Sequence, residues 1–313
     1  MFRTRIPRPE RARMRAAVGP FKKTLIKPST LKSYQFSLQL FYLWLAFWSL
    51  SWPSDRDELD TLGSQFAEAA WEEGESRSVF ACLVSGIPYL VPSLRNSLLG
   101  SRSLITAWDK SESITRSFPI SEMMAFALAG EALACGWSLD AAAILIGFAG
   151  MFRVMELLGI TACEVSGTLS DESLTVQLVH TKTSNRKQIV EKALIKEPKA
   201  AALLLARCSD RQPGDQIFQG LSPKQLPSHL RQLSVKLGLG DLLITPHSLR
   251  RGKATARFRQ CGSFHVVADE GRWESLKTCR KYVDEATKEL ASYTVDPAKL
   301  QLPCQELDSL FQG

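Results

Sequence analysis

The chain has 313 residues, a formal net charge of +7 and 45% hydrophobic residues. This length and apolar fraction suffice for two domains with separate cores, which argues against a chain that is disordered throughout. The positive charge predicts a polyanionic partner, with nucleic acid ahead of an acidic membrane surface. The seven cysteines form no C-x-x-C pair and no Cys/His cluster, which argues against a disulfide framework or a metal site and favours a reducing compartment.

The chain begins with a basic segment. Residues 1–27 hold many Arg and Lys residues and one acidic residue, Glu10. Because Pro7, Pro9 and Pro20 interrupt any long helix, we predict a flexible basic arm. A nuclear-import patch, a DNA-tracking arm, an organelle transit peptide and a solvated tail all remain open for it.

Residues 28–112 predict a small all-helical domain. Its first helix contains the uncharged stretch "FSLQLFYLWLAFWSLSW" (36–52), whose length and polar residues favour a buried helix over a membrane span. Two further helices are expected to begin after Ser54 and Ser76, since serine is a good N-cap residue. A fourth is expected within residues 92–110.

Residues 113–295 predict a second domain that is mainly helical with a small β-hairpin. Two apolar helices are separated near Gly136. Alternating apolar residues from Leu174 to Leu178 then predict a strand, a turn at Ser184-Asn185 and a returning strand. More helices are expected over 199–208, 222–237, 246–261 and 276–292. The tail, residues 296–313, carries an apolar segment that we expect to dock on a neighbouring protomer.

Two arginines in this domain fit phosphate binding. In "TPHSLRRG", Pro246 suits a first helical position and places His247 and Arg250 near a helix start, where backbone N–H groups favour an anion. By itself the H-x-x-R pattern favours an ordinary surface helix. In "GMFRVMELL", Arg153 lies in an apolar stretch, so it needs either an internal ion pair with Glu156 or a bound anion.

Four segments, taken together and in chain order, resemble the catalytic domain of the tyrosine recombinase (phage integrase) family. They are "FRVMELLGI", "HTKT", "HSLRRG" and "GRWESLKTCRKY". The preceding helical domain resembles the family's core-binding (SAM-like) domain more loosely. The resemblance implies a catalytic set of Arg153, Glu156, Lys182, His247, Arg250, Trp273 and Tyr282.

The resemblance also implies a role for each of these residues. Tyr282 is the nucleophile, Arg153 and Arg250 grip the scissile phosphate, and Glu156 steadies Arg153. His247 moves a proton to or from the phenol. Trp273 takes a position that is more often histidine in the family, and its indole N–H still donates a hydrogen bond.

Protonation of the leaving 5′ oxygen falls to Lys182, with Lys187 as a rival in the same turn region. Neighbouring basic residues are expected to contact backbone phosphates, with a solvated helix face as the alternative. These candidate DNA contacts are Arg251, Lys253, Lys277, Arg280 and Lys281.

The implied activity is site-specific DNA recombination through a 3′-phosphotyrosyl intermediate and a Holliday junction, with a tetramer on two duplexes. The sequence has no phosphate-binding G-x-x-x-x-G-K-[ST] loop and no obvious carboxylate cluster, so we expect neither a nucleotide nor a metal cofactor. A type IB topoisomerase and a DNA-binding relative that no longer cuts are the alternatives. We expect no membrane association, and either a bacterial cytoplasm or a eukaryotic nucleus fits.

Overall fold

The computed structural model describes residues 7–18, 26–112, 116–171, 173–179, 190–283 and 296–311. The chain divides into two compact units, residues 1–115 and 116–313. We describe each unit by itself.

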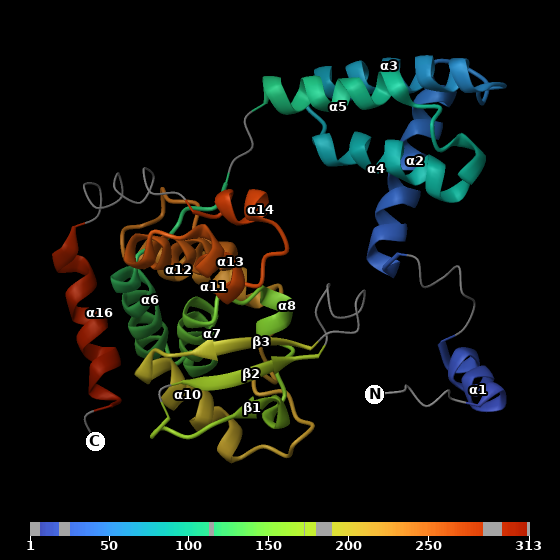
Figure 1. Cartoon of the computed structure of the whole chain (residues 1–313). Coiled ribbons are helices and arrows are strands. Elements are labelled where there is room, and N and C mark those ends of the chain that lie inside the picture. Colours follow the sequence, from blue (N-terminus) through green and yellow to red (C-terminus); the bar gives the residue numbers. More distant parts are fainter. Residues whose placement is uncertain are drawn as a thin grey trace. The chain divides into compact units, whose positions relative to one another are not determined.

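The first unit is built from helices (Figure 1). They are α1 (Arg8–Val18), α2 (Pro28–Phe47), α3 (Arg56–Glu72), α4 (Arg77–Leu90), the short 3-10 helix η2 (Pro92–Leu94) and α5 (Leu99–Ser111). The N-cap of α3 is Asp55, whose carboxylate accepts from the backbone N–H groups of Asp57 and Glu58. This side chain satisfies two of the four donors that a helix start leaves unpaired.

The structure adds to one expectation for this unit and corrects another. The basic arm contains a short helix, α1, with Pro9 in its first turn, where proline is tolerated, and the flexibility of the arm stays a prediction. The apolar helix α2, expected to be a buried helix, is buried along one side only. Phe41 and Leu45 lie in the core, whereas Phe36, Leu43 and Phe47 are exposed. Among the described helices, none is long and apolar enough to cross a membrane.

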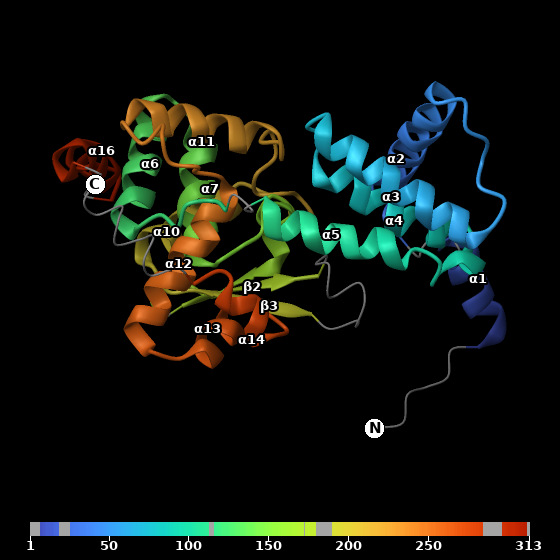
Figure 2. The same cartoon turned by 90° about the horizontal axis from the view of Figure 1, so that it is seen from above.

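The second unit combines helices with a small sheet, as expected (Figures 1 and 2). Its elements are α6 (Glu122–Ala134), α7 (Ser138–Ala149), α8 (Val154–Leu157), η3 (Ala162–Glu164), β1 (Val165–Ser166), β2 (Leu174–Leu178), β3 (Glu191–Ile195), α10 (Pro198–Ser209), α11 (Gln225–Lys236), α12 (Pro246–Cys261), α13 (Phe264–Glu270), α14 (Leu276–Arg280) and α16 (Pro297–Ser309).

The sheet has the strand order β1-β2-β3, and both pairs are antiparallel. Strands β2 and β3 form the predicted hairpin, in register from Leu174 opposite Ile195 to Leu178 opposite Glu191. The predicted turn at Ser184-Asn185 lies outside the described residues. Leu174, Val176 and Leu178 face the core because alternate side chains of a strand point to the same side.

Helix α7 runs through the middle of the unit, and every residue from Asp140 to Ala149 is buried. It packs against α6, α10 and α12, so the following turn, Gly150 to Arg153, is held at a fixed place beside the start of α12. This packing brings one arginine-bearing segment to the other.

The C-terminal helix α16 lies beside α6 of the same chain (Figure 1). Leu300 and Leu307 are buried in the core of the unit, and Gly130 of α6 lets the backbone at Pro303 approach so closely that a Cβ atom would collide with its carbonyl. Docking of this tail on a neighbouring protomer therefore stays a prediction. It would require α16 to leave α6 of its own chain and to pack on another copy.

Candidate active site

The start of α12 presents two of the predicted site residues. The Thr245 N–H donates to Ser248 Oγ at 3.0 Å, and Pro246 is the first helical residue. His247 follows and is partly exposed, whereas the Arg250 side chain is completely buried. A fully buried guanidinium must have its charge and its donors matched by the surrounding protein.

The partners of Arg250 are backbone carbonyls from two distant segments. Its Nη1 donates to the Met151 carbonyl and its Nη2 to the Gly271 carbonyl, at 2.6 Å in the second case. Its guanidinium carbon lies 4.3 Å from the centre of the Trp273 ring. Arg250 therefore joins the turn after α7 to the turn after α13.

Burial lowers the pKa of Arg250 to about 9, and the positive charges of Arg153 and Arg272 contribute to the shift. At neutral pH the guanidinium is still charged. The shift means that several positive charges are held close together with little water, an environment that favours a bound anion.

Glu156 lies among these arginines. Its Oε1 accepts from the Arg153 guanidinium, while its Oε2 accepts from the Arg153 backbone N–H at 3.0 Å and lies 3.8 Å from Arg250 Nη1. Burial by itself would raise the pKa of Glu156, but the hydrogen bond from the Arg153 backbone and the charges of Arg153 and Arg272 lower it below its usual value. Of the two alternatives posed from the sequence, the internal ion pair between Arg153 and Glu156 is present, and the binding of an anion by Arg153 stays a prediction.

Arg272 is a member of this cluster to which the sequence assigned no role. Its Nη1 donates to the Gly150 carbonyl at 3.1 Å, and its Nη2 donates to the Met151 carbonyl at 3.0 Å and to Glu156 Oε2 at 3.3 Å. The only signal for it in the sequence is a charged residue between Gly271 and the aromatic Trp273.

Trp273 and Tyr282 lie against each other beside Arg250. Their ring centres are 4.9 Å apart, at an interplanar angle of 49°. The Trp273 indole N–H is buried and has no hydrogen-bond acceptor among the described residues. It is therefore a donor available to a bound oxyanion.

Tyr282 does not lie within a long helix, and that expectation is wrong. Helix α14 begins at its N-cap Ser275 and ends at Arg280, after which the Tyr282 N–H donates to the Cys279 carbonyl at 2.9 Å in a turn. Arg251 Nη1 donates to the Lys281 carbonyl at 2.8 Å. The tyrosine is therefore tethered to α12 through its preceding residue.

The charges of the site also act on His247. Partial burial and the positive charges of Arg250, Arg153 and Arg251 lower the pKa of His247 below its usual value of 6.5. The imidazole is therefore neutral at pH 7 and able to accept a proton.

The remaining predicted residues fall into three groups. Lys182 and Lys187 lie outside the described residues. Lys277, Arg280 and Lys281 are exposed near Tyr282. Arg251 is buried, and Lys253 lies over the Phe148 ring, 3.7 Å from a Glu122 carboxylate oxygen. DNA contact by these residues stays a prediction.

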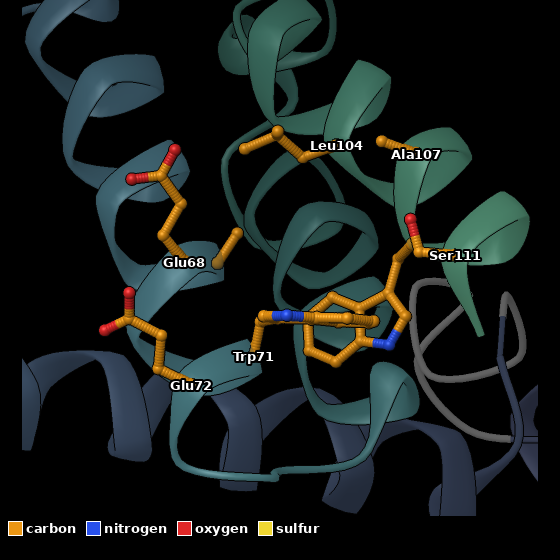
Figure 3. Close-up of a pocket in the computed structure, with 8 residues that line it drawn as sticks. Glu68, Trp71, Glu72, Leu104, Ala107 and Ser111 are labelled. Atoms are coloured by element: carbon orange, nitrogen blue, oxygen red, sulfur yellow. The ribbon is translucent and has the colours of Figure 1, made fainter.

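A separate pocket of about 200 Å³ lies between α3 and α5 in the first unit (Figure 3). Trp71 and Trp108 meet edge to face in it, with ring centres 5.0 Å apart. Glu68 and Glu72 project from α3 beside them. Since carboxylates repel phosphates, Glu68 and Glu72 disfavour a bound phosphate at this pocket.

Solved structures share the fold of this chain. An integrase of the transposon Tn1549, in complex with transposon right end DNA, aligns with a TM-score of 0.61 at 11% identity, over 90% of this chain and 96% of that one. A lambda integrase dimer bound to a COC′ core site aligns with a TM-score of 0.59 at 15% identity, over 88% of this chain and 94% of that one. The recombinase XerH bound to a palindromic difH substrate aligns with a TM-score of 0.53 at 17% identity, over 83% of this chain and 78% of that one.

No family model and no curated protein matches the sequence. The structural neighbours nevertheless span both units, and they are recombinases and integrases. The fold is that of the tyrosine recombinases, as the four sequence segments indicate.

Proposed function

We propose that this protein is a site-specific DNA recombinase of the tyrosine family. The observation that carries the proposal is the convergence of Arg250, Trp273 and Tyr282, with the Glu156–Arg153 ion pair beside Arg250. These residues come from three segments that are far apart in the chain, and the fold is one that DNA-bound recombinases share.

The proposed first step is attack of the Tyr282 phenol oxygen on a backbone phosphorus. A bond forms between that oxygen and phosphorus, and the bond from phosphorus to the 5′ oxygen of the next nucleotide breaks. The phenol proton passes to neutral His247, and a lysine, Lys182 or Lys187, protonates the departing 5′ oxygen. The strand is left with a free 5′ hydroxyl and a 3′-phosphotyrosyl end.

We assign stabilisation of the transition state to the cluster of positive charges formed by Arg153, Arg250 and Arg272. Arg250 is held by two backbone carbonyls. The Arg153 side chain is one-third exposed, so Arg153 has donors left for the phosphate. The Trp273 N–H supplies a neutral donor. Donors fixed before the reaction stabilise developing charge without having to reorganise.

Rejoining is the reverse reaction with a different 5′ hydroxyl, so one phosphodiester bond is exchanged for another and no ATP is consumed. Two duplexes and four copies of the chain are required if each strand is cut by its own tyrosine. A tetramer that passes through a Holliday junction is accordingly part of the proposal. The monomeric topoisomerase mechanism uses the same chemistry on one strand and gives relaxed circles instead of exchanged strands.

The test is to trap the covalent intermediate. Incubation with a library of nicked duplexes is expected to give a protein-DNA adduct that survives denaturing electrophoresis, because a cut next to a nick releases a short fragment and prevents rejoining. Tyr282→Phe keeps the ring against Trp273 and is expected to bind DNA without forming an adduct. Tyr293→Phe, at the next tyrosine in the chain, serves as the matched control. An adduct in Tyr282→Phe would refute the assignment.

Strand exchange separates the alternatives. The sequences recovered in the adduct are placed on two plasmids, and recombinant products are expected. Relaxation of a single plasmid without exchange would identify a topoisomerase, and DNA binding without any adduct would identify an inactive relative.

A further inference from the structure

Arg272 adopts a backbone conformation that its residue type disfavours. Its φ is +59°, in the left-handed region where a Cβ atom is crowded and glycine is favoured. Its side chain is only 5% exposed. A long, charged side chain kept at a strained, buried position must make contacts that offset both costs.

The contacts of Arg272 connect the parts of the site to each other. The guanidinium donates to the carbonyls of Gly150 and Met151 and to Glu156 Oε2. Its Nη1 also lies 3.3 Å from the Glu270 carbonyl, within its own turn. Arg272 therefore fixes the turn that leads into Arg153 against the turn that leads into Trp273.

Arg250 shares two of these partners. Both guanidiniums donate to the Met151 carbonyl, and both lie near Glu156 Oε2, at 3.8 Å for Arg250 and 3.3 Å for Arg272. Met151 itself has a left-handed φ of +49°, which is the second strained residue in the same contact. Two strained turns thus face each other and are joined by two arginines.

We propose that Arg272 is a positioning residue that, together with Arg250, holds Arg153 in place for the scissile phosphate. The proposal deepens the recombinase function and rests on it. Arg272, like Arg250, has both terminal nitrogens bound to protein acceptors and almost no exposed surface. Arg153, whose side chain is one-third exposed, is therefore the arginine through which both act on the phosphate.

The first test compares Arg272→Gly and Arg272→Lys with Arg257→Ala. Glycine suits the left-handed φ, so this change removes the guanidinium while relieving the backbone. Lysine keeps the charge but lacks the fork that reaches several acceptors. The control, Arg257, pairs with Glu270 at 2.8 and 2.9 Å near the same turn but outside the site.

The readout separates binding from chemistry. We expect Arg272→Gly to lower the single-turnover rate of adduct formation at saturating DNA about 100-fold, the size expected when a preorganised donor is removed. Its Kd for DNA is expected to stay within about 3-fold of the wild-type value, because phosphate contacts elsewhere dominate affinity. Arg272→Lys should be impaired similarly and Arg257→Ala unaffected.

A double-mutant cycle excludes a merely structural role. If Arg272 acts through Arg153, then Arg153→Ala combined with Arg272→Gly should be no more than about 3-fold slower than Arg153→Ala alone. Multiplicative losses would overturn the proposal, and so would wild-type cleavage by a folded Arg272→Gly or Arg272→Lys variant.

A binding measurement keeps this proposal separate from the recombinase proposal. Inorganic sulfate, as a mimic of the phosphate, is expected to raise the melting temperature of the wild-type protein and of Arg257→Ala, but not that of Arg272→Gly or Arg272→Lys. If these melting-temperature differences are seen but no DNA adduct forms, the recombinase function is contradicted and the positioning role is supported. Equal responses in all four proteins would overturn the positioning role whether or not the adduct forms.

Discussion

The guanidinium carbon of Arg250 lies 5.7 Å from the centre of the Tyr282 ring. The two residues are brought together because Arg250 binds the Gly271 carbonyl and Trp273 packs on both of them. A phenol that loses its proton next to a fixed cation has its developing negative charge stabilised. The contact places the ring of the proposed nucleophile beside a fixed positive charge.

Glu156→Gln is expected to destabilise the second unit. The substitution leaves Arg250 and Arg272 buried without their carboxylate, which typically costs about 3 kcal/mol and lowers a melting temperature by about 8 °C in a unit of this size. Scanning calorimetry measures the shift. Glu270→Gln removes a more exposed partner of Arg257 and should change the melting temperature by about 1 °C. Equal shifts would show that Glu156 does not neutralise the cluster.

The pH dependence of cleavage should report His247. Its pKa lies below 6.5 in the free protein, and a general base acts only when it is unprotonated. The rate at low DNA concentration is therefore expected to rise with pH on the acid side of 6.5 and to be level above about pH 7.5. His247→Ala should be about 100-fold slower and lose this rise. A wild-type rate that falls over the same range would contradict the role.

The lysine that protonates the leaving oxygen can be identified with a sulfur substrate. A 5′-thiolate leaves without a proton, so the correct lysine becomes dispensable on a duplex with sulfur at the bridging position. We expect Lys182→Ala to be slow on normal DNA and largely restored on the sulfur substrate. Restoration of Lys187→Ala, with no restoration of Lys182→Ala, would transfer the role to Lys187.

The exposed basic residues near Tyr282 should set part of the salt dependence of DNA binding. Replacing Lys277, Arg280 and Lys281 with Gln is expected to reduce the slope of log Kd against log salt by about 2 to 3, close to one unit for each phosphate that is no longer neutralised. A double control, Lys199→Gln with Lys236→Gln, removes cations that pair with Asp308 and Glu131. An unchanged slope in the triple variant would indicate a solvated helix face.

Much of the fold could be predicted because its signals are local. Pro246 and the glycine after Cys261 fix both ends of α12, and the predicted and observed bounds agree. The break at Gly136 is confirmed by its φ of +76°. The alternation from Leu174 to Leu178 is confirmed as strand β2.

The rest of the site depends on contacts that no local pattern encodes. Arg272 acts through carbonyls more than a hundred residues away, and its φ follows from a turn whose shape is set by the Trp273 ring beside Gly271. The end of α14 at Arg280 could not be predicted because Lys281 and Tyr282 continue a pattern that also suits a helix. The burial of Arg251 could not be predicted because a basic residue at a helix start is equally compatible with a DNA contact.

The two carbonyl acceptors of Arg250 lie 99 residues before it and 21 residues after it. During synthesis the ribosome must therefore release Gly271 before the guanidinium has both of its partners, and Tyr282, the proposed nucleophile, emerges only after that. A prematurely terminated product that ends before Gly271 lacks the tyrosine and also leaves Arg250 without its second acceptor. Under the proposed function, copies that end before Tyr282 are therefore unable to cut DNA.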